Sequence, residues 1–107
     1  MLVFISAAAV PDAPRNLRAF ARTPVSISVS WDSPTAASTA VLGYMVYYYD
    51  VSSSETREQE LNVTSNACTL ADLRKYHQYS VRVVAFSAVG LGASTQEVYC
   101  RTLSDGE

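Results

Sequence analysis

Apolar and polar residues alternate along much of this chain of 107 residues. The alternation is clearest in Val25–Trp31, where every odd position is apolar and every even position is serine. Side chains of a β-strand point alternately to its two faces, so this pattern predicts a strand with one buried and one hydrated face. Tyr79–Phe86 repeats the alternation and predicts a second such strand.

The other apolar segments are also short, and turn residues separate them. Leu42–Tyr49 is apolar on both faces, which favours a central strand. Thr56–Leu61 is polar and charged, as expected of a strand at the edge of a sheet. Three further segments supply inward positions at Leu17, Ala19, Cys68, Leu70, Val98 and Cys100. Together these segments predict seven strands in an all-β sandwich or barrel.

Composition indicates a single folded domain. Apolar residues make up 49% of the chain and charged residues 17%, which excludes a disordered tail. The formal charge of -2 provides no basic field that would attract nucleic acid. No apolar stretch approaches the ~20 residues of a membrane span, so we expect no direct membrane contact. Arg15, Arg18 and Arg22 cluster near the first strand, but Arg15 and Arg18 should face opposite sides, which predicts scattered surface charge.

Turn and core residues follow one another in a recognisable order. The order is Pro14–Leu17, Trp31 with Ser33 and Pro34, Gly43–Tyr48, Leu73 with Tyr79, and Val81–Ala85 with Gly90, Gly92 and Ser94. In this combination, from about Val10 to Leu103, the chain resembles the fibronectin type III domain. The resemblance implies a seven-stranded immunoglobulin-like β-sandwich, with no cofactor.

The resemblance also implies which residues form the core. Trp31 would lie at its centre, and Tyr79, which follows Leu73, would be a tyrosine corner whose hydroxyl bonds backbone at the turn. Around Trp31 we expect Ile27, Val29, Tyr44, Val46, Leu70, Leu73, Tyr79, Val81 and Val83. Arg74–His77 replaces the Pro-Gly turn that is usual in the family, so the shape of this turn is open.

The two ends resemble linkers between tandem repeats. Pro11–Pro14 and Thr102–Asp105 look like the linkers in immunoglobulin-superfamily receptors of the DCC/neogenin subclass. We therefore expect residues 1–10 to be a linker or a cloning remnant, residues 11–103 the domain, and residues 104–107 a linker to a following domain. The expected partners are neighbouring immunoglobulin or fibronectin type III domains and, in addition, a protein ligand.

Residues capable of chemistry are sparse. His77 is the only histidine, and it falls in a turn without the nucleophile and acid of a catalytic triad, so a solvated turn residue is expected. Metal binding by His77 with Cys68 and Cys100 would leave a tetrahedral site one ligand short. Gly90–Gly92 lies between strands with no helix after it, which predicts a hairpin turn and not a phosphate loop. We expect no catalytic residue, no metal and no enzyme activity.

Two features concern the cellular compartment. A disulfide between Cys68 and Cys100 would suit an extracellular protein. The resemblance instead places them in different sheets, beyond the ~7 Å between Cα atoms that a disulfide allows, and so favours two buried thiols.

Asn62-Val63-Thr64 is an N-glycosylation acceptor, expected to be accessible just beyond the edge strand Thr56–Leu61.

One face of the sandwich is predicted to be an interaction surface. If Tyr44, Val46 and Tyr48 point inward, the residues between them point outward. In the expected sheet they join outward residues of the sixth and seventh strands, and the candidate interface is Met45, Tyr47, Tyr49, Arg82, Phe86 and Tyr99. Aromatic, Met and Arg side chains are enriched in protein interfaces. The alternative is that they form cross-strand pairs that only stabilise the sheet.

The sequence thus favours a non-enzymatic extracellular module of a multidomain cell-surface receptor or adhesion protein, which spaces domains and contacts proteins. One alternative is an intracellular module of a cytoskeletal or muscle protein, which would accommodate two free thiols. Another is an isolated binder on the same scaffold, whose loops would be rich in aromatic residues. Residues 35–40 and 89–93 hold no aromatic residue, which counts against the binder.

Overall fold

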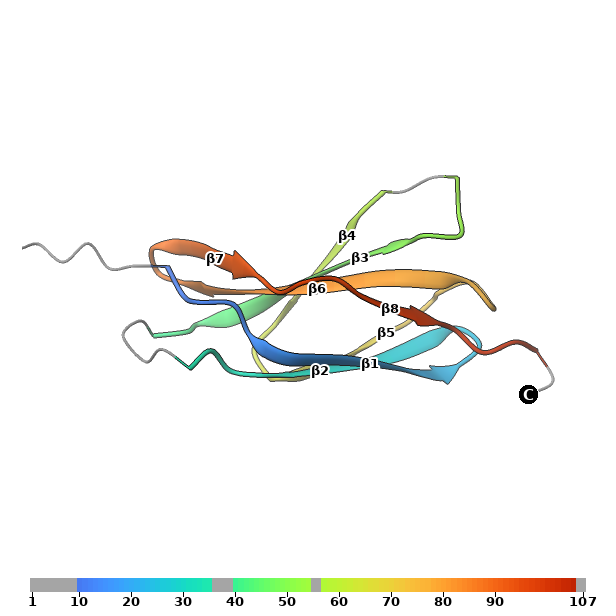
Figure 1. The fold of residues 1–107 in the computed structure, drawn as a ribbon, viewed down its shortest axis with the longest axis horizontal. Helices are drawn as coiled ribbons and strands as arrows, with labels where there is room; N and C mark the ends of the chain where they lie inside the picture. Colours follow the sequence, from blue (N-terminus) through green and yellow to red (C-terminus); the bar gives the residue numbers. More distant parts are fainter. Residues whose placement is uncertain (1–9, 36–39, 55–56, 106–107) are drawn as a thin grey trace, which may run out of the picture.

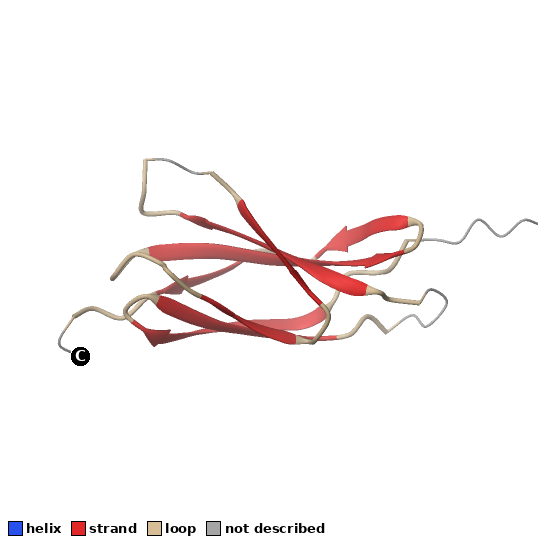
Figure 2. Ribbon diagram, turned by 180° about the vertical axis from the view of Figure 1, so that it is seen from behind, coloured by secondary structure: helices blue, strands red, loops and turns tan. Residues whose placement is uncertain are grey.

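The computed structural model describes residues 10–35, 40–54 and 57–105. In this part of the chain the backbone forms strands and no helix, and the strands make two sheets that pack face to face (Figures 1 and 2). The strands are β1 (Arg15–Thr23), β2 (Ser26–Asp32), β3 (Gly43–Asp50), β4 (Gln59–Val63), β5 (Ala67–Leu70), β6 (Gln78–Ser87), β7 (Gly90–Ser94) and β8 (Val98–Arg101). The predicted all-β sandwich is confirmed, and the segment 1–9 lies outside the described residues.

The expected last strand is divided into β7 and β8, so the described residues contain eight strands and not seven. One sheet has the order β1-β2-β5, and the other has the order β4-β3-β6-β7 with β8 also paired to β6. Thr95, between β7 and β8, explains the division. Its N–H donates to the Val83 carbonyl at 2.9 Å, and its hydroxyl accepts from the Val83 N–H at 3.0 Å. The Thr95 side chain therefore takes a position that a backbone carbonyl would fill in a continuous ladder.

Trp31 lies at the centre of the core between the two sheets, and only 1% of its surface is exposed. Its ring meets the Tyr44 ring edge-on, with the centroids 5.3 Å apart. The buried cluster around it is Ile27, Val29, Tyr44, Val46, Leu70, Leu73, Tyr79, Val81, Val83 and Ala85. Every residue expected around Trp31 is in this cluster.

The predicted hairpin turn at Gly90–Gly92 is wrong. These residues begin β7, and the turn lies at Ala88–Val89, since Ser87 pairs with Gly90. Gly92 is required for another reason: a Cβ on it would lie 2.1 Å from the Pro11 carbonyl oxygen, which is too close for any side chain. The glycine thus allows the segment before β1 to cross β7, as glycines inside strands often do.

The predicted edge strand is shifted along the chain. β4 begins at Gln59 and extends to Val63, whereas Thr56 lies outside the described residues. Asn62 is therefore inside the edge strand and not beyond it.

Arg15 and Arg18 lie on the same face, which corrects the expectation of opposite faces. A register shift in β1 separates them, with Asn16 at a φ of 55°. Arg15 therefore pairs with Asp32 and Arg18 with Ser30, two outward positions of β2. Arg18 lies 3.5 Å from the Asp32 carboxylate, so its charge is matched within the sheet. The Asn16 hydrogen bond, reinforced by Arg18, holds the pKa of Asp32 below its usual value.

Candidate interaction face

The outer face of the five-stranded sheet, which points away from the other sheet, carries the six predicted interface residues. Adjacent residues across antiparallel strands share a face. The register places Met45 beside Val84, Tyr47 beside Arg82, and Tyr49 beside Ser80. Ser80 in turn neighbours Tyr99 on β8. Phe86 follows Arg82 and Val84 on the same side of β6, so the face is continuous.

The centre of the outer face is covered by its own side chains. Tyr47 is only 9% exposed, which corrects the expectation that it forms accessible surface. The Arg82 guanidinium lies 4.2 Å from the centre of the Tyr47 ring, a cation–π contact. The Glu58 carboxylate accepts two hydrogen bonds of 3.2 Å from this guanidinium, so the Arg82–Glu58 ion pair covers the ring. Tyr47 and Arg82 thus stabilise the sheet.

Tyr49 and Tyr99, which we call the tyrosine pair, form the accessible end of the outer face. They flank Ser80, which is only 1% exposed although it points outward. Tyr99 itself is 55% exposed and donates its hydroxyl to Glu97 at 2.9 Å. That bond and the negative charge of Glu97 raise the pKa of Tyr99. The pair presents aromatic surface with a polar tip, as protein contact sites commonly do.

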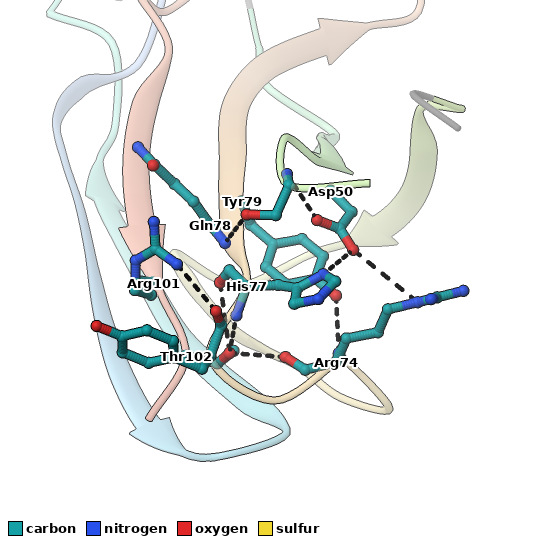
Figure 3. Close-up of polar contacts among 9 residues, drawn as sticks. Asp50, Arg74, His77, Gln78, Tyr79, Arg101 and Thr102 are labelled. Carbon is teal, nitrogen blue, oxygen red and sulfur yellow. Dashed lines mark hydrogen bonds and ion pairs between the residues drawn. The ribbon is translucent and has the colours of Figure 1, made fainter. Parts of the chain in front are cut away.

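The tyrosine corner lies at the end of the sandwich where β8 ends and β6 begins (Figure 3). The Tyr79 hydroxyl accepts a hydrogen bond of 2.8 Å from the Arg74 N–H. Thr102, only 1% exposed, completes the corner from the other side. Its hydroxyl accepts from the His77 N–H at 3.0 Å and donates to the Arg74 carbonyl at 2.6 Å. The sequence resemblance had grouped Thr102 with the linker, but it fixes both sides of this turn.

His77 is not the solvated turn residue that was expected. Its Nδ1 lies 2.7 Å from the Asp50 carboxylate (Figure 3), and its side chain is 30% exposed. Asp50 also accepts from the Ser52 N–H at 2.9 Å and lies 4.0 Å from Arg74. The carboxylate thus ties the end of β3 to the turn before β6. This is a structural arrangement, and we assign it no catalytic role.

Tyr76 occupies the turn where the family usually has glycine. Its φ of 53° lies in the left-handed region that favours glycine. Three contacts hold it there. Arg101 donates to the Tyr76 carbonyl at 2.9 Å, and its guanidinium lies 4.8 Å from the centre of the Tyr76 ring. The Tyr76 N–H donates to the Leu103 carbonyl at 3.2 Å. The turn thus keeps a left-handed residue without glycine, and Arg101 and Leu103 hold that residue in place.

The described residues contain no cluster of three or more metal-ligating side chains. Nor does this part of the chain include a helix of the length and apolarity that crossing a membrane requires.

The two cysteines are free thiols on opposite sheets, Cys68 on β5 and Cys100 on β8. Both are half-buried, so the expectation of two buried thiols is corrected. Burial raises the pKa of the Cys68 thiol to about 11. Burial also raises the pKa of Cys100, although a hydrogen bond with the Ala21 backbone opposes this effect.

We predict that Cys68 alkylates slowly in the folded protein. At pH 8 a thiol with a pKa near 11 carries about a hundredfold less thiolate than an ordinary cysteine, and the thiolate is the reactive form. Iodoacetamide labelling followed by peptide mass analysis measures the rate, which should rise with pH up to about 11. In denaturant without reductant both thiols should react at once, whereas finding no free thiol there would show a disulfide.

Asn62 is exposed on β4, opposite Met45 of β3. Its glycosylation remains a prediction.

Comparison with known proteins relates the chain to cell-surface receptors. The family model of the fibronectin type III domain matches residues 12–101. Mouse neogenin is 41% identical over 96 residues, which are 90% of this chain and 6% of that protein. The human netrin receptor DCC is 35% identical over 96 residues, again 90% of this chain and 6% of the relative. The chain thus spans only a small part of these relatives.

A solved structure supports the fold. The structure of chicken CNTN1 domains FN1–FN3 superimposes with a TM-score of 0.79 at 24% identity, over 90% of this chain and 33% of that one. At this identity the likeness concerns the fold alone.

Proposed function

Because this chain belongs to the fibronectin type III family, we propose that it is a non-enzymatic extracellular module of a multidomain receptor, and that its outer face contacts a neighbouring domain or a protein ligand. The observation that carries this proposal is the 41% identity to mouse neogenin over 96 residues. The expected resemblance to the DCC/neogenin subclass is confirmed by the same relatives.

The choice of contact surface is supported by exposure. The covered centre of the outer face, Tyr47 beneath Arg82, offers little accessible area to a partner. The tyrosine pair offers a ring that is more than half exposed and a hydroxyl at its rim. Tyrosine is enriched in binding hot spots because it brings large contact area with few rotatable bonds.

The two free thiols favour the alternative of an intracellular module, since thiols persist in reducing compartments. Similarity to a titin structure does not strengthen this alternative, because at 20% identity it concerns the fold alone. Staining intact cells that express the full-length parent chain, with an antibody against this domain, separates the two. We expect staining without permeabilisation, and staining only after permeabilisation would favour the intracellular alternative.

We predict that a photo-crosslinking phenylalanine analogue at position 99 of the full-length parent chain couples to protein. Tyr99 lies in the proposed contact, so the product should join this domain to a neighbouring domain or to a ligand. Peptide mass spectrometry identifies the joined segments. A further Tyr49→Ser change should lower the yield severalfold, because Tyr49 flanks the same position across Ser80.

Phe20 provides the matched control. It is 63% exposed on β1, in the other sheet, so it has similar accessibility but lies away from the outer face. The analogue at position 20 should give little product. Equal yields from positions 20 and 99 would show that the tyrosine pair is ordinary exposed surface.

A further inference from the structure

Asn62 has the position that a glycan acceptor needs in the folded domain. On β4, Leu61 and Val63 pack against the core, so Asn62 between them points outward. Both Asn62 and Thr64, the two required residues of the acceptor triplet, are exposed. β4 is also the edge strand of its sheet, paired only to β3 in the described residues. A bulky group on Asn62 therefore requires no rearrangement of the sandwich.

The strand register shows where such a group would stand. Asn62 neighbours Met45, Met45 neighbours Val84, and Val84 neighbours Ser94, so these four residues form one row across the outer face. The tyrosine pair lies in another row, four residues further along β3. At ~3.4 Å per residue and ~4.8 Å per strand, Asn62 is roughly 20 Å from Tyr99. The two ends of the outer face are thus well separated.

We propose that Asn62 carries an N-linked glycan that covers the Met45 end of the outer face and leaves the tyrosine pair free for protein contact. This inference rests on the extracellular location proposed above. It also explains how the edge strand is protected, because a glycan beside the unpaired edge of β4 hinders edge-to-edge pairing with another chain.

The reaction needs a lipid-pyrophosphate-linked oligosaccharide as co-reactant. The Asn62 amide nitrogen forms a bond to the anomeric carbon of the sugar, and the bond from that carbon to the pyrophosphate oxygen breaks. The bonding electrons leave with the lipid pyrophosphate, and the amide nitrogen loses one proton to a base. Nothing is oxidised or reduced.

The first experiment tests the site itself. The full chain is produced behind a cleavable secretion signal in a eukaryotic host, together with the variants Thr64→Ala and Asn62→Gln. The wild-type protein should show a series of hexosamine and hexose masses that peptide N-glycosidase removes, leaving aspartate at position 62. Both variants should be unmodified. An unmodified Asn62 in the secreted wild-type protein would overturn the proposal.

The second experiment tests where the glycan stands. Hydroxyl-radical footprinting compares the glycosylated wild type with the folded Thr64→Ala variant. Oxidation of Met45 should be severalfold slower in the glycosylated protein, whereas oxidation of Tyr99 should be unchanged. Equal oxidation of Met45, or protection of Tyr99, would contradict the placement. Because the secretion signal is supplied, both results are independent of the parent protein's location, which the staining of intact cells reports separately.

Discussion

Replacing Trp31 with alanine is expected to lower the free energy of unfolding by about 3–5 kcal/mol. Trp31 is 1% exposed and lies at the centre of the core, where its ring meets Tyr44. Alanine would lose the transfer free energy of the indole and leave a cavity that the two strand ladders cannot close. A domain of this size has about 5–15 kcal/mol of stability in total, so the variant would be close to unfolding. Denaturant titration monitored by circular dichroism measures the change.

Trp31→Phe is the matched control for this prediction. The Trp31 Nε1–H is buried and has no hydrogen-bond partner in the described residues, so phenylalanine removes an unsatisfied donor while keeping an aromatic ring. The phenylalanine variant should therefore lose clearly less stability than the alanine variant. A loss below about 1 kcal/mol for Trp31→Ala, the scale of a surface substitution, would show that the indole does not support the core.

Thr102→Val is expected to cost about 2–4 kcal/mol, although valine has nearly the same shape as threonine. The change removes the hydroxyl that accepts from the His77 N–H and donates to the Arg74 carbonyl. An unpaired buried backbone group costs about 1–3 kcal/mol, and because both of these groups are only part-buried, each should cost about 1–2 kcal/mol. Because no cavity forms, the loss measures the two hydrogen bonds. Thermal and denaturant unfolding of the purified variant provide the measurement.

Thr102→Ser keeps the hydroxyl and loses only a methyl group, so it should be the milder change. The order of the two variants is the test: if serine were as costly as valine, the methyl group and not the hydroxyl would account for the stability of the corner. Hydrogen exchange at the His77 amide adds a local readout, since protection should fall in the valine variant and persist in the serine variant.

In the strictly alternating strands the orientation of side chains was predictable from the sequence, but which of them other side chains cover was not. Strict alternation in Val25–Trp31 is enough to place Trp31 inward. Alternate side chains of a strand share a face, so the apolar residues can be buried together only if Trp31 points into the core. The same count places Tyr47 outward, where the structure has it. It cannot show that Arg82 covers the Tyr47 ring, because Glu58, which fixes Arg82, lies 24 residues away and precedes β4.

The glycines near the last hairpin show a second limit. Gly90 and Gly92 suggested a turn because glycine adopts turn conformations readily. Gly92 is instead selected by the approach of the Pro11 backbone, a contact between residues far apart in the chain. A local turn and the close approach of a distant backbone segment both require glycine. The sequence alone therefore does not distinguish the two causes.

The corner at Thr102 was missed for a similar reason. The sequence signal for Tyr79 is a fixed spacing from Leu73 within one turn, and the hydrogen bond to Arg74 follows from it. Thr102 reaches the same turn from the end of another strand, 28 residues from Arg74. Nothing in the sequence around a threonine after the final strand shows whether its hydroxyl bonds to the turn or belongs to a linker.

The attachment of the two ends determines how the domain would respond to mechanical tension. The first and last described segments of the chain leave the sandwich at opposite ends, and the strands run along the line that joins these ends (Figure 1). At the N-terminal end, the Ala93 N–H donates to the Pro11 carbonyl at 3.2 Å. At the C-terminal end, the Leu103 N–H donates to the Thr23 carbonyl at 3.4 Å, the Leu103 carbonyl accepts from the Tyr76 N–H at 3.2 Å, and Asp105 pairs with Lys75 at 2.9 Å. A pulling force would meet these few contacts first and release a few residues at each end. Only then would it act in shear on the β1–β2 and β6–β8 hydrogen-bond ladders, where many bonds resist together. The domain would therefore extend by a few residues at low force and then resist further extension until a much higher force.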